Sequence, residues 1–255
     1  MALQLGRALG RGARRSASVS GLVVLVLSVL YQLAFLGAVN TAVVNLLPDG
    51  VRPTDAGAIG FSLPISTEMA GVLAVASLLF GTGVFVVAAR LLARDPTTLG
   101  SLPTDAFTRR IGRALLSALV VNLVLAVAIP LGLALFVIPG LFLAVSFQFA
   151  VFAIAVEDAG PVGALKRSWA LASGDRWRLL VLVLLLAVVG GVSGAVGSLF
   201  SLADPLVGQL LSLALTSVVL VLMYGILADA FLQLREEPVF GTGGGSPGTA
   251  DVGAL

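Results

Sequence analysis

One stretch, residues 178–201, decides the fold of this chain: RLLVLVLLLAVVGGVSGAVGSLFS. Its only charged residue is the arginine at its start. About 20 consecutive apolar residues are needed for an α-helix to cross the ~30 Å hydrocarbon core of a bilayer, and this run is long enough. Lipid offers no partners for backbone N–H and C=O groups, so a segment of this composition must be a helix there. The stretch therefore predicts a transmembrane helix.

Five more apolar stretches surround it, at residues 20–46, 68–93, 111–137, 140–157 and 206–232. The whole chain of 255 residues is 58% hydrophobic and 11% charged, whereas soluble proteins are roughly 45–50% apolar and about 25% charged. We therefore expect an all-α fold, a polytopic membrane helical bundle of about six transmembrane helices with short interfacial helices. Residues 1–237 form the membrane domain, and the glycine-rich residues 238–255 are expected to be a disordered tail.

The third and fourth stretches allow two arrangements. The fourth is the shortest, and it depends on a tight turn at Pro139 and Gly140, while Pro130 is expected to kink the third. Residues 111–157 are preceded and followed by basic residues, which fits two full crossings or a re-entrant pair that never crosses. Their combined length favours two crossings.

Basic residues cluster at alternate ends of these stretches. Of the fifteen Lys and Arg residues, all except Arg52 fall on the same predicted side. Cytoplasmic loops retain positive charge, so this pattern predicts a multi-pass protein of the plasma membrane with both termini in the cytoplasm.

Two basic segments are candidate contacts for anionic lipid headgroups or for a partner protein. Residues 2–16 suit a short helix lying in the inner headgroup layer. Residues 157–178 contain both tryptophans, which are typical interfacial anchors, and they suit either a simple connector helix or a docking site. The candidate residues are Arg7, Arg11, Arg14, Arg15, Lys166, Arg167, Trp169 and Trp177.

Three polar residues inside the apolar stretches are candidates for a mid-membrane site: Asn122, Gln148 and Asp229. A charge in a membrane helix is costly, so we expect Asp229 to pair with Arg235 or with an arginine of a neighbouring loop. For the other two, hydrogen bonds between helices are the expected role. Convergence of all three on a water-filled cavity would favour transport, and contacts in a dry seam would favour a scaffold.

Small residues recur at four-residue spacing in the fifth stretch, at Gly190, Gly194 and Ser198. Such residues let helix backbones approach closely. We expect a close-packed seam there, either inside the bundle or at an interface between two copies of the chain.

One part of the sequence resembles a known family. The pattern runs from Ile138-Pro139-Gly140 through Val156-Glu157-Asp158 and Gly160-Pro161 to Ala164-Leu165-Lys166-Arg167-Ser168-Trp169. It is similar to the membrane domain that accompanies some glycerophosphoryl diester phosphodiesterases, and to related archaeal and bacterial multi-pass proteins. The catalytic barrel of those enzymes does not fit in this chain. The resemblance therefore implies a stand-alone membrane module and no phosphodiesterase residues.

The composition also argues against several functions. With no Cys and no His, the chain lacks thiol nucleophiles and the commonest general base and metal ligand, and no pair of carboxylates faces each other within a stretch. We therefore expect no enzymatic activity, cofactor or metal, and no nucleic-acid partner, since no basic face is interleaved with aromatic residues. The prediction is a non-enzymatic membrane scaffold or lipid-associated accessory module, with a small-solute or lipid transporter as the alternative.

Overall fold

The structure, a computed structural model, describes residues 4–48 and 60–236 of the chain. Throughout these two ranges the chain forms helices joined by turns and loops, without any β-strand. Six segments are long and apolar enough to cross a membrane. The expected all-α helical bundle is confirmed. The predicted tail, 238–255, lies outside the described residues.

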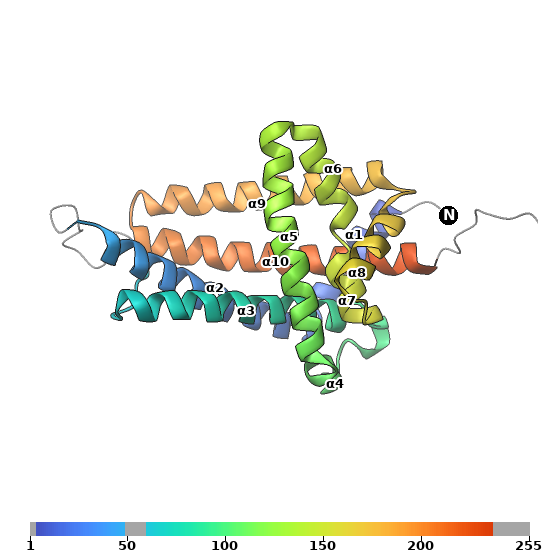
Figure 1. Cartoon of the computed structure of the whole chain (residues 1–255), viewed down its shortest axis with the longest axis horizontal. Helices are drawn as coiled ribbons and strands as arrows, with labels where there is room; N and C mark the ends of the chain where they lie inside the picture. The colour runs from blue at the N-terminus through green and yellow to red at the C-terminus, as the bar shows by residue number, and fades with distance from the viewer. Residues whose placement is uncertain (1–3, 49–59, 237–255) are drawn as a thin grey trace, which may run out of the picture.

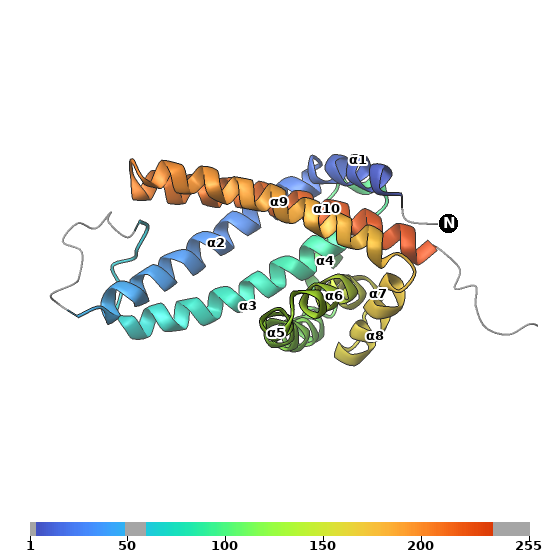
Figure 2. The ribbon, with the colours of Figure 1, turned by 90° about the horizontal axis from the view of Figure 1, so that it is seen from above.

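Four long helices run along the length of the molecule: α2 (Val19–Leu46), α3 (Thr67–Leu92), α9 (Arg176–Ser201) and α10 (Pro205–Glu236). α2 packs against α3, and α9 against α10 (Figures 1 and 2). Their starts lie within two residues of the sequence-based boundaries. Helix α10 continues to Glu236, past the predicted end at 232, and its last turns contact the N-terminal segment through Asp229 and Gln233.

A helical hairpin lies across these four helices. It consists of α5 (Ile111–Leu135), followed by α6 (Val137–Phe147) and α7 (Ala150–Glu157). Helix α5 runs across the long axis in Figure 1 and is seen nearly end-on in Figure 2. The predicted fourth stretch, 140–157, is thus two helices with a break between them.

The turn of this hairpin is at Phe136, not at Pro139 and Gly140 as the sequence suggested. Phe136 alone has extended backbone angles, with φ −155° and ψ 137°. Pro139 and Gly140 lie in the first turn of α6, where proline is tolerated because its missing N–H would have no helical partner. Pro130 lies inside α5, as expected.

The short helices gather at one end of the bundle, which we call the basic end. They are α1 (Leu5–Ser16), α4 (Asp105–Thr108) and α8 (Pro161–Ala172), beside the last turns of α3 and α10 (Figure 1). A single 3₁₀ turn, η1 (Pro96–Thr98), follows α3. The opposite end, which we call the loop end, holds the end of α2, the start of α3 and the α9–α10 turn.

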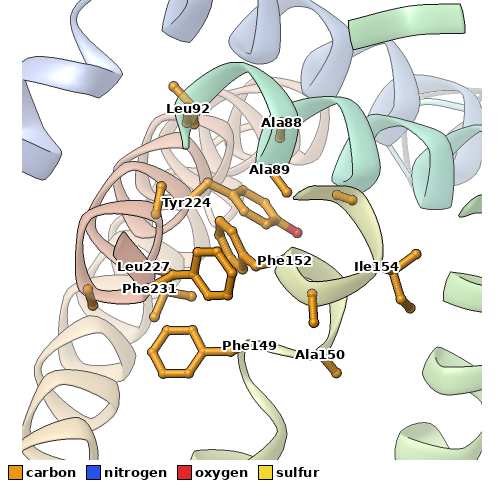
Figure 3. Packing of buried hydrophobic residues seen from close by; sticks show 14 of the residues in the cluster. Ala88, Ala89, Leu92, Phe149, Ala150, Phe152, Ile154, Tyr224, Leu227 and Phe231 are labelled. Atoms are coloured by element: carbon orange, nitrogen blue, oxygen red, sulfur yellow. The ribbon is translucent and has the colours of Figure 1, made fainter. Parts of the chain in front are cut away.

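The best-buried core lies towards the basic end, where α7 packs against α3 and α10. Phe152 of α7 stacks on Phe231 of α10 with ring centroids 5.6 Å apart, and it also meets Tyr224 at 6.4 Å. Phe149 adds a fourth ring, which packs against Phe231 (Figure 3). Small residues of α3, Ala88 and Ala89, allow this close approach. Aromatic pairs of this kind contribute about 0.5–1.5 kcal/mol each beyond their buried area.

The predicted small-residue seam is not formed inside the chain. Gly190 and Gly194 have no atom within 4 Å of the place where a Cβ would stand, and Ser198 is exposed. The close approach between α9 and α10 occurs instead at Gly197, whose Cβ position lies 2.7 Å from Cβ of Ser212. An interface between two copies at Gly190, Gly194 and Ser198 remains a prediction.

Candidate functional site

The basic end carries most of the charged groups of the described chain, and most of its arginines have partners. Helix α1 is the clearest case. The sequence suggested a short helix in the inner headgroup layer; in the structure this helix, α1, packs along α10, with Ala8 and Gly12 buried between them. A Cβ added to Gly12 would stand 2.5 Å from the Cα of Ile226, so only glycine permits this packing.

Asp229 of α10 is the carboxylate that holds α1. It is 1% exposed, and its Oδ1 lies 3.2 Å from Nε of Arg11 and 3.4 Å from Nε of Arg15. Its Oδ2 accepts a 2.8 Å hydrogen bond from Nε2 of Gln233, whose Oε1 in turn accepts from the backbone N–H of Gln4. The buried charge of Asp229 is therefore compensated by two guanidinium groups and one amide donor.

Arg15 extends this contact to a third helix. Its side chain is 5% exposed, and Nη1 donates to the carbonyl oxygens of Leu92, at 2.8 Å, and Arg94. These carbonyls end α3, where the helix leaves acceptors unsatisfied and carries partial negative charge. A single guanidinium thus joins α1, α3 and α10.

A second buried arginine follows the same principle at the end of α7. Arg90 of α3 donates from Nε to Ala155 O at 3.0 Å and from Nη1 to Ala106 O at 3.3 Å. Beside it, Arg109 forms a 3.0 Å ion pair with Asp158, which ends α7 in the left-handed region with φ 54°. Both arginines therefore cap the C-terminal turn of α7.

The loop after α3 is fixed by hydrogen bonds of its own. Arg94 donates to the carbonyl oxygens of Thr98 and Ser101. Thr97 donates from its hydroxyl and its backbone N–H to Asp95, and these two bonds lower the pKa of the Asp95 carboxyl.

Glu157 connects three helices at the same end. Both of its oxygens accept from Arg167 of α8, at 3.0 and 3.2 Å, and Arg235 of α10 approaches to 3.7 Å. The expected pairing of Asp229 with Arg235 was therefore wrong, because the partners of Asp229 come from α1. Reasoning from neighbouring turns and loops could not find them, since α1 and Asp229 are more than 200 residues apart in the sequence.

Ser168 of α8 bridges the break between α6 and α7. Its hydroxyl donates to Ser146 O at 2.8 Å and accepts from the backbone N–H of Phe149 at 3.1 Å. The break would otherwise leave this buried N–H without a partner. The sequence analysis did not single out Ser168 for this role. The only signal in the sequence was that this hydroxyl lies on an otherwise apolar face of α8.

The two tryptophans have different surroundings. Trp169 packs against Phe142 and Phe147 of α6, and the guanidinium of Arg176 lies 4.5 Å from the Trp169 ring and 4.7 Å from the Phe142 ring. Such cation–π contacts contribute roughly 0.5–2 kcal/mol. Trp177, 79% exposed, projects from the start of α9.

Five basic side chains at this end are exposed and form no ion pair with any described residue: Arg7, Arg14, Arg110, Arg113 and Lys166. Arg7 and Arg14 lie two turns apart on α1, and Arg110 and Arg113 lie at the start of α5. Of the eight residues predicted to contact lipid or a partner, Arg7, Arg14, Lys166 and the two tryptophans thus remain exposed. Arg11 and Arg167 are partly engaged, and Arg15 is buried.

The three polar residues predicted for a mid-membrane site do not converge. Asp229 lies in the ion pair with α1, and Gln148 lies at the α6–α7 break with both of its amide atoms buried and without a hydrogen bond. Asn122 lies midway along α5 and is partly exposed. These positions belong to three separate parts of the fold, so they do not form one site.

Two hollows are lined by other residues. An open apolar groove of about 440 Å³ runs between the α1–α2 elbow and α10, lined by residues such as Ser16, Leu22 and Leu222. A crevice of about 250 Å³ separates α2 from α10 nearer the loop end, lined by Gln32 and Gln209 among others. No group of three or more His, Cys, Asp or Glu residues that would suit a metal occurs in residues 4–48 and 60–236.

Comparison with known proteins adds a family but no activity. No curated protein and no solved structure matches this chain. A family model described as "Domain of unknown function (DUF7847)" matches residues 3–234, which is nearly the whole helical part, from before α1 to the last turn of α10. The chain therefore belongs to the DUF7847 family.

Proposed function

We propose that this protein is a non-enzymatic plasma-membrane module whose basic end faces the cytoplasm and binds anionic lipid headgroups, so that it acts as a scaffold or lipid-associated accessory protein. The observation that carries the proposal is that the basic residues fall into two groups, one buried between helices and one exposed. The buried arginines join helices, whereas Arg7, Arg14, Arg110, Arg113 and Lys166 are exposed and form no ion pair within residues 4–48 and 60–236. Each exposed cation near an anionic membrane surface contributes about 1 kcal/mol.

The apolar groove at the α1–α2 elbow supports the same proposal. It is open at the side of the bundle, and Ala13 and Ser16 of α1 form part of its lining. Arg14 is adjacent to Ala13 in α1 and is exposed. A lipid could place its acyl chain in this apolar groove and its anionic headgroup beside Arg14.

The transporter alternative has one feature in its favour, the crevice between α2 and α10. Both of its glutamines, however, already have protein partners: Gln32 donates to the hydroxyl of Ser217 on α10 at 2.7 Å, and Gln209 accepts from the backbone N–H of Phe61, in the segment before α3, at 2.5 Å. Polar groups that are hydrogen-bonded within the protein favour a packed contact between its segments, so the scaffold is the better-supported proposal.

The resemblance to the membrane domain of glycerophosphoryl diester phosphodiesterases belongs to the proposal as well. The residues that carry it have structural contacts: Glu157 and Arg167 pair, Ser168 bridges the α6–α7 break, and Trp169 packs on α6. None of these contacts is a reaction centre. They support a shared architecture rather than a shared activity.

Lipidomics of purified protein tests headgroup binding. Two variants, R7Q/R14Q on α1 and R110Q/R113Q/K166Q near the start of α5 and on α8, are reconstituted in nanodiscs with equal phosphatidylglycerol and phosphatidylethanolamine. We expect both to retain less anionic lipid than the wild type, and Arg178→Gln, whose charge is already balanced by Asp175, to change little. Equal retention in all four proteins would contradict the proposal.

A further inference from the structure

We propose that the α5–α6 hairpin does not cross the membrane but lies within the cytoplasmic leaflet, with its exposed apolar side chains against acyl chains. The identity of that leaflet rests on the proposed orientation of the basic end. The in-plane position of the hairpin does not, because it follows from where the hairpin meets α9.

The first turn of α9 marks the membrane–water boundary. Arg178 pairs with Asp175 at 2.6 Å just outside the helix, and Trp177 is 79% exposed between two arginines. Tryptophan and arginine at the end of an apolar helix are typical of the interface. From Arg176, the 26 residues of α9 extend about 39 Å, enough to reach the other surface.

The hairpin tip lies near this boundary rather than at the far surface. Arg176 lies over the ring of Phe142, the sixth residue of α6, and Trp169 packs on the same ring. Phe142 lies five residue steps, about 7.5 Å of helix, from the tip at Val137. Even if α6 pointed straight into the bilayer, its tip would stop far short of the ~30 Å that a crossing requires.

The start of α5 lies at the basic end too. Arg110 and Arg113 share a small cavity with Asp158 and Ala159, the residues that follow α7. The other end of α5 is held to α6, where the Cβ position of Gly132 lies 3.0 Å from the Cα of Gly140. A helix of 25 residues whose two ends both lie near one surface must run along that surface. Figures 1 and 2 show this orientation, with α5 across the four long helices.

The chemistry of the hairpin fits hydrocarbon rather than water. Residues 114–156 contain no charged residue. The tip exposes Leu135, Phe136, Val137 and Ile138 at 63–80% of their surface. Its backbone needs few partners, because the N–H of Phe136 bonds to Gly132 O and Pro139 has no N–H. The α9–α10 turn at the loop end, by contrast, contains the exposed Asp204, as a turn in water would.

Single cysteines test this position directly, because the chain has none of its own. Ile138→Cys at the tip is compared with Asp204→Cys at the loop end and Lys166→Cys at the basic end, in the full chain. An impermeant maleimide is applied to intact and then to permeabilised cells. We expect Asp204→Cys to react from outside, Lys166→Cys only after permeabilisation, and Ile138→Cys not to react from outside.

Spin labels at the same tip position then measure depth in vesicles of phosphatidylglycerol and phosphatidylethanolamine. Val181→Cys and Val188→Cys on the exposed face of α9 are the depth standards, about 7.5 and 18 Å beyond Arg176. We expect the Ile138 label to be accessible to oxygen and to lie within one helical turn, ~5 Å, of the Val181 depth.

Each other outcome has a distinct meaning. Reaction of Ile138→Cys from outside, or a depth at or beyond that of Val188, would overturn the proposal and establish a crossing. Low oxygen access together with spin–spin broadening at Ile138 would show that a second copy, not lipid, covers the hairpin. If Asp204→Cys and Lys166→Cys exchange their labelling while the Ile138 depth is as expected, the proposed orientation fails but the in-plane hairpin stands.

Discussion

Replacing Asp229 by Asn tests the role of the buried carboxylate at the basic end. The substitution keeps the size of the side chain and one acceptor oxygen, and it removes the charge that faces Arg11 and Arg15. It also puts an amide where Oδ2 accepts from Gln233. Rotating the Gln233 amide to compensate would break the hydrogen bond that its Oε1 accepts from Gln4.

The magnitude follows from how well each group is buried. Breaking a fully buried ion pair costs about 3–5 kcal/mol, and Arg15 is 5% exposed. Arg15 keeps its bond to Leu92 O, which reduces the loss, and the pair with Arg11, 45% exposed, adds at most about 1 kcal/mol. We expect the Asp229→Asn substitution to destabilise α1 docking by roughly 2–4 kcal/mol.

The assay follows α1 through its own residue Ala8, which lies on the face packed against α10 and is 0% exposed. With Ala8→Cys as the reporter, a maleimide reacts only when α1 leaves α10. A loss of 2–4 kcal/mol in docking free energy raises the fraction of molecules in which α1 has left α10 by roughly 30- to 700-fold, since each 1.4 kcal/mol is a factor of ten. The labelling rate should rise accordingly, and the exposed Asp105→Asn variant should leave it unchanged. An Asp229→Asn rate within threefold of the wild type would refute the reasoning.

Three further predictions use thermal unfolding in detergent, followed by circular dichroism. Glu157→Gln should lower the free energy of unfolding by only about 1 kcal/mol, because the partners of Glu157 are partly exposed. A loss above about 3 kcal/mol would contradict this. Ser168→Ala leaves the buried N–H of Phe149 unpaired and should cost about 1–3 kcal/mol; no change would mean that the break has another partner. Gly12→Ala places a methyl 2.5 Å from a backbone Cα of α10 and should cost about 1–3 kcal/mol of stability. The control Gly10→Ala, with open space around it, should stabilise α1. Equal effects of the two substitutions would exclude tight packing as the cause.

Much of the fold could be predicted from the sequence. The apolar stretches became helices with nearly the predicted starts, Val19 for 20 and Thr67 for 68, because chain length and hydrocarbon leave no other structure. The connector helix expected within residues 157–178 forms as α8, which begins at Pro161, where the missing N–H costs nothing. These predictions depend on local composition alone.

The candidate site was less accessible to such reasoning. Arg7 and Arg15 are both arginines of one amphipathic helix, yet the first is exposed and the second joins three helices. Gly190 and Gly197 are both small residues of one apolar helix, yet only the second packs on a neighbour. Nothing in the local pattern separates the members of either pair.

The sequence by itself determined the class of protein, the approximate starts of its four long helices, and the concentration of positive charge at one end of them. The tertiary structure alone decided that Asp229 holds α1, that Glu157 meets Arg167, and that α5 runs across the bundle. The physical reason is that lipid tails and protein interiors are equally apolar. An apolar helix in a membrane therefore does not reveal which of its faces is buried, and the partners of its few polar groups are fixed only when the helices pack.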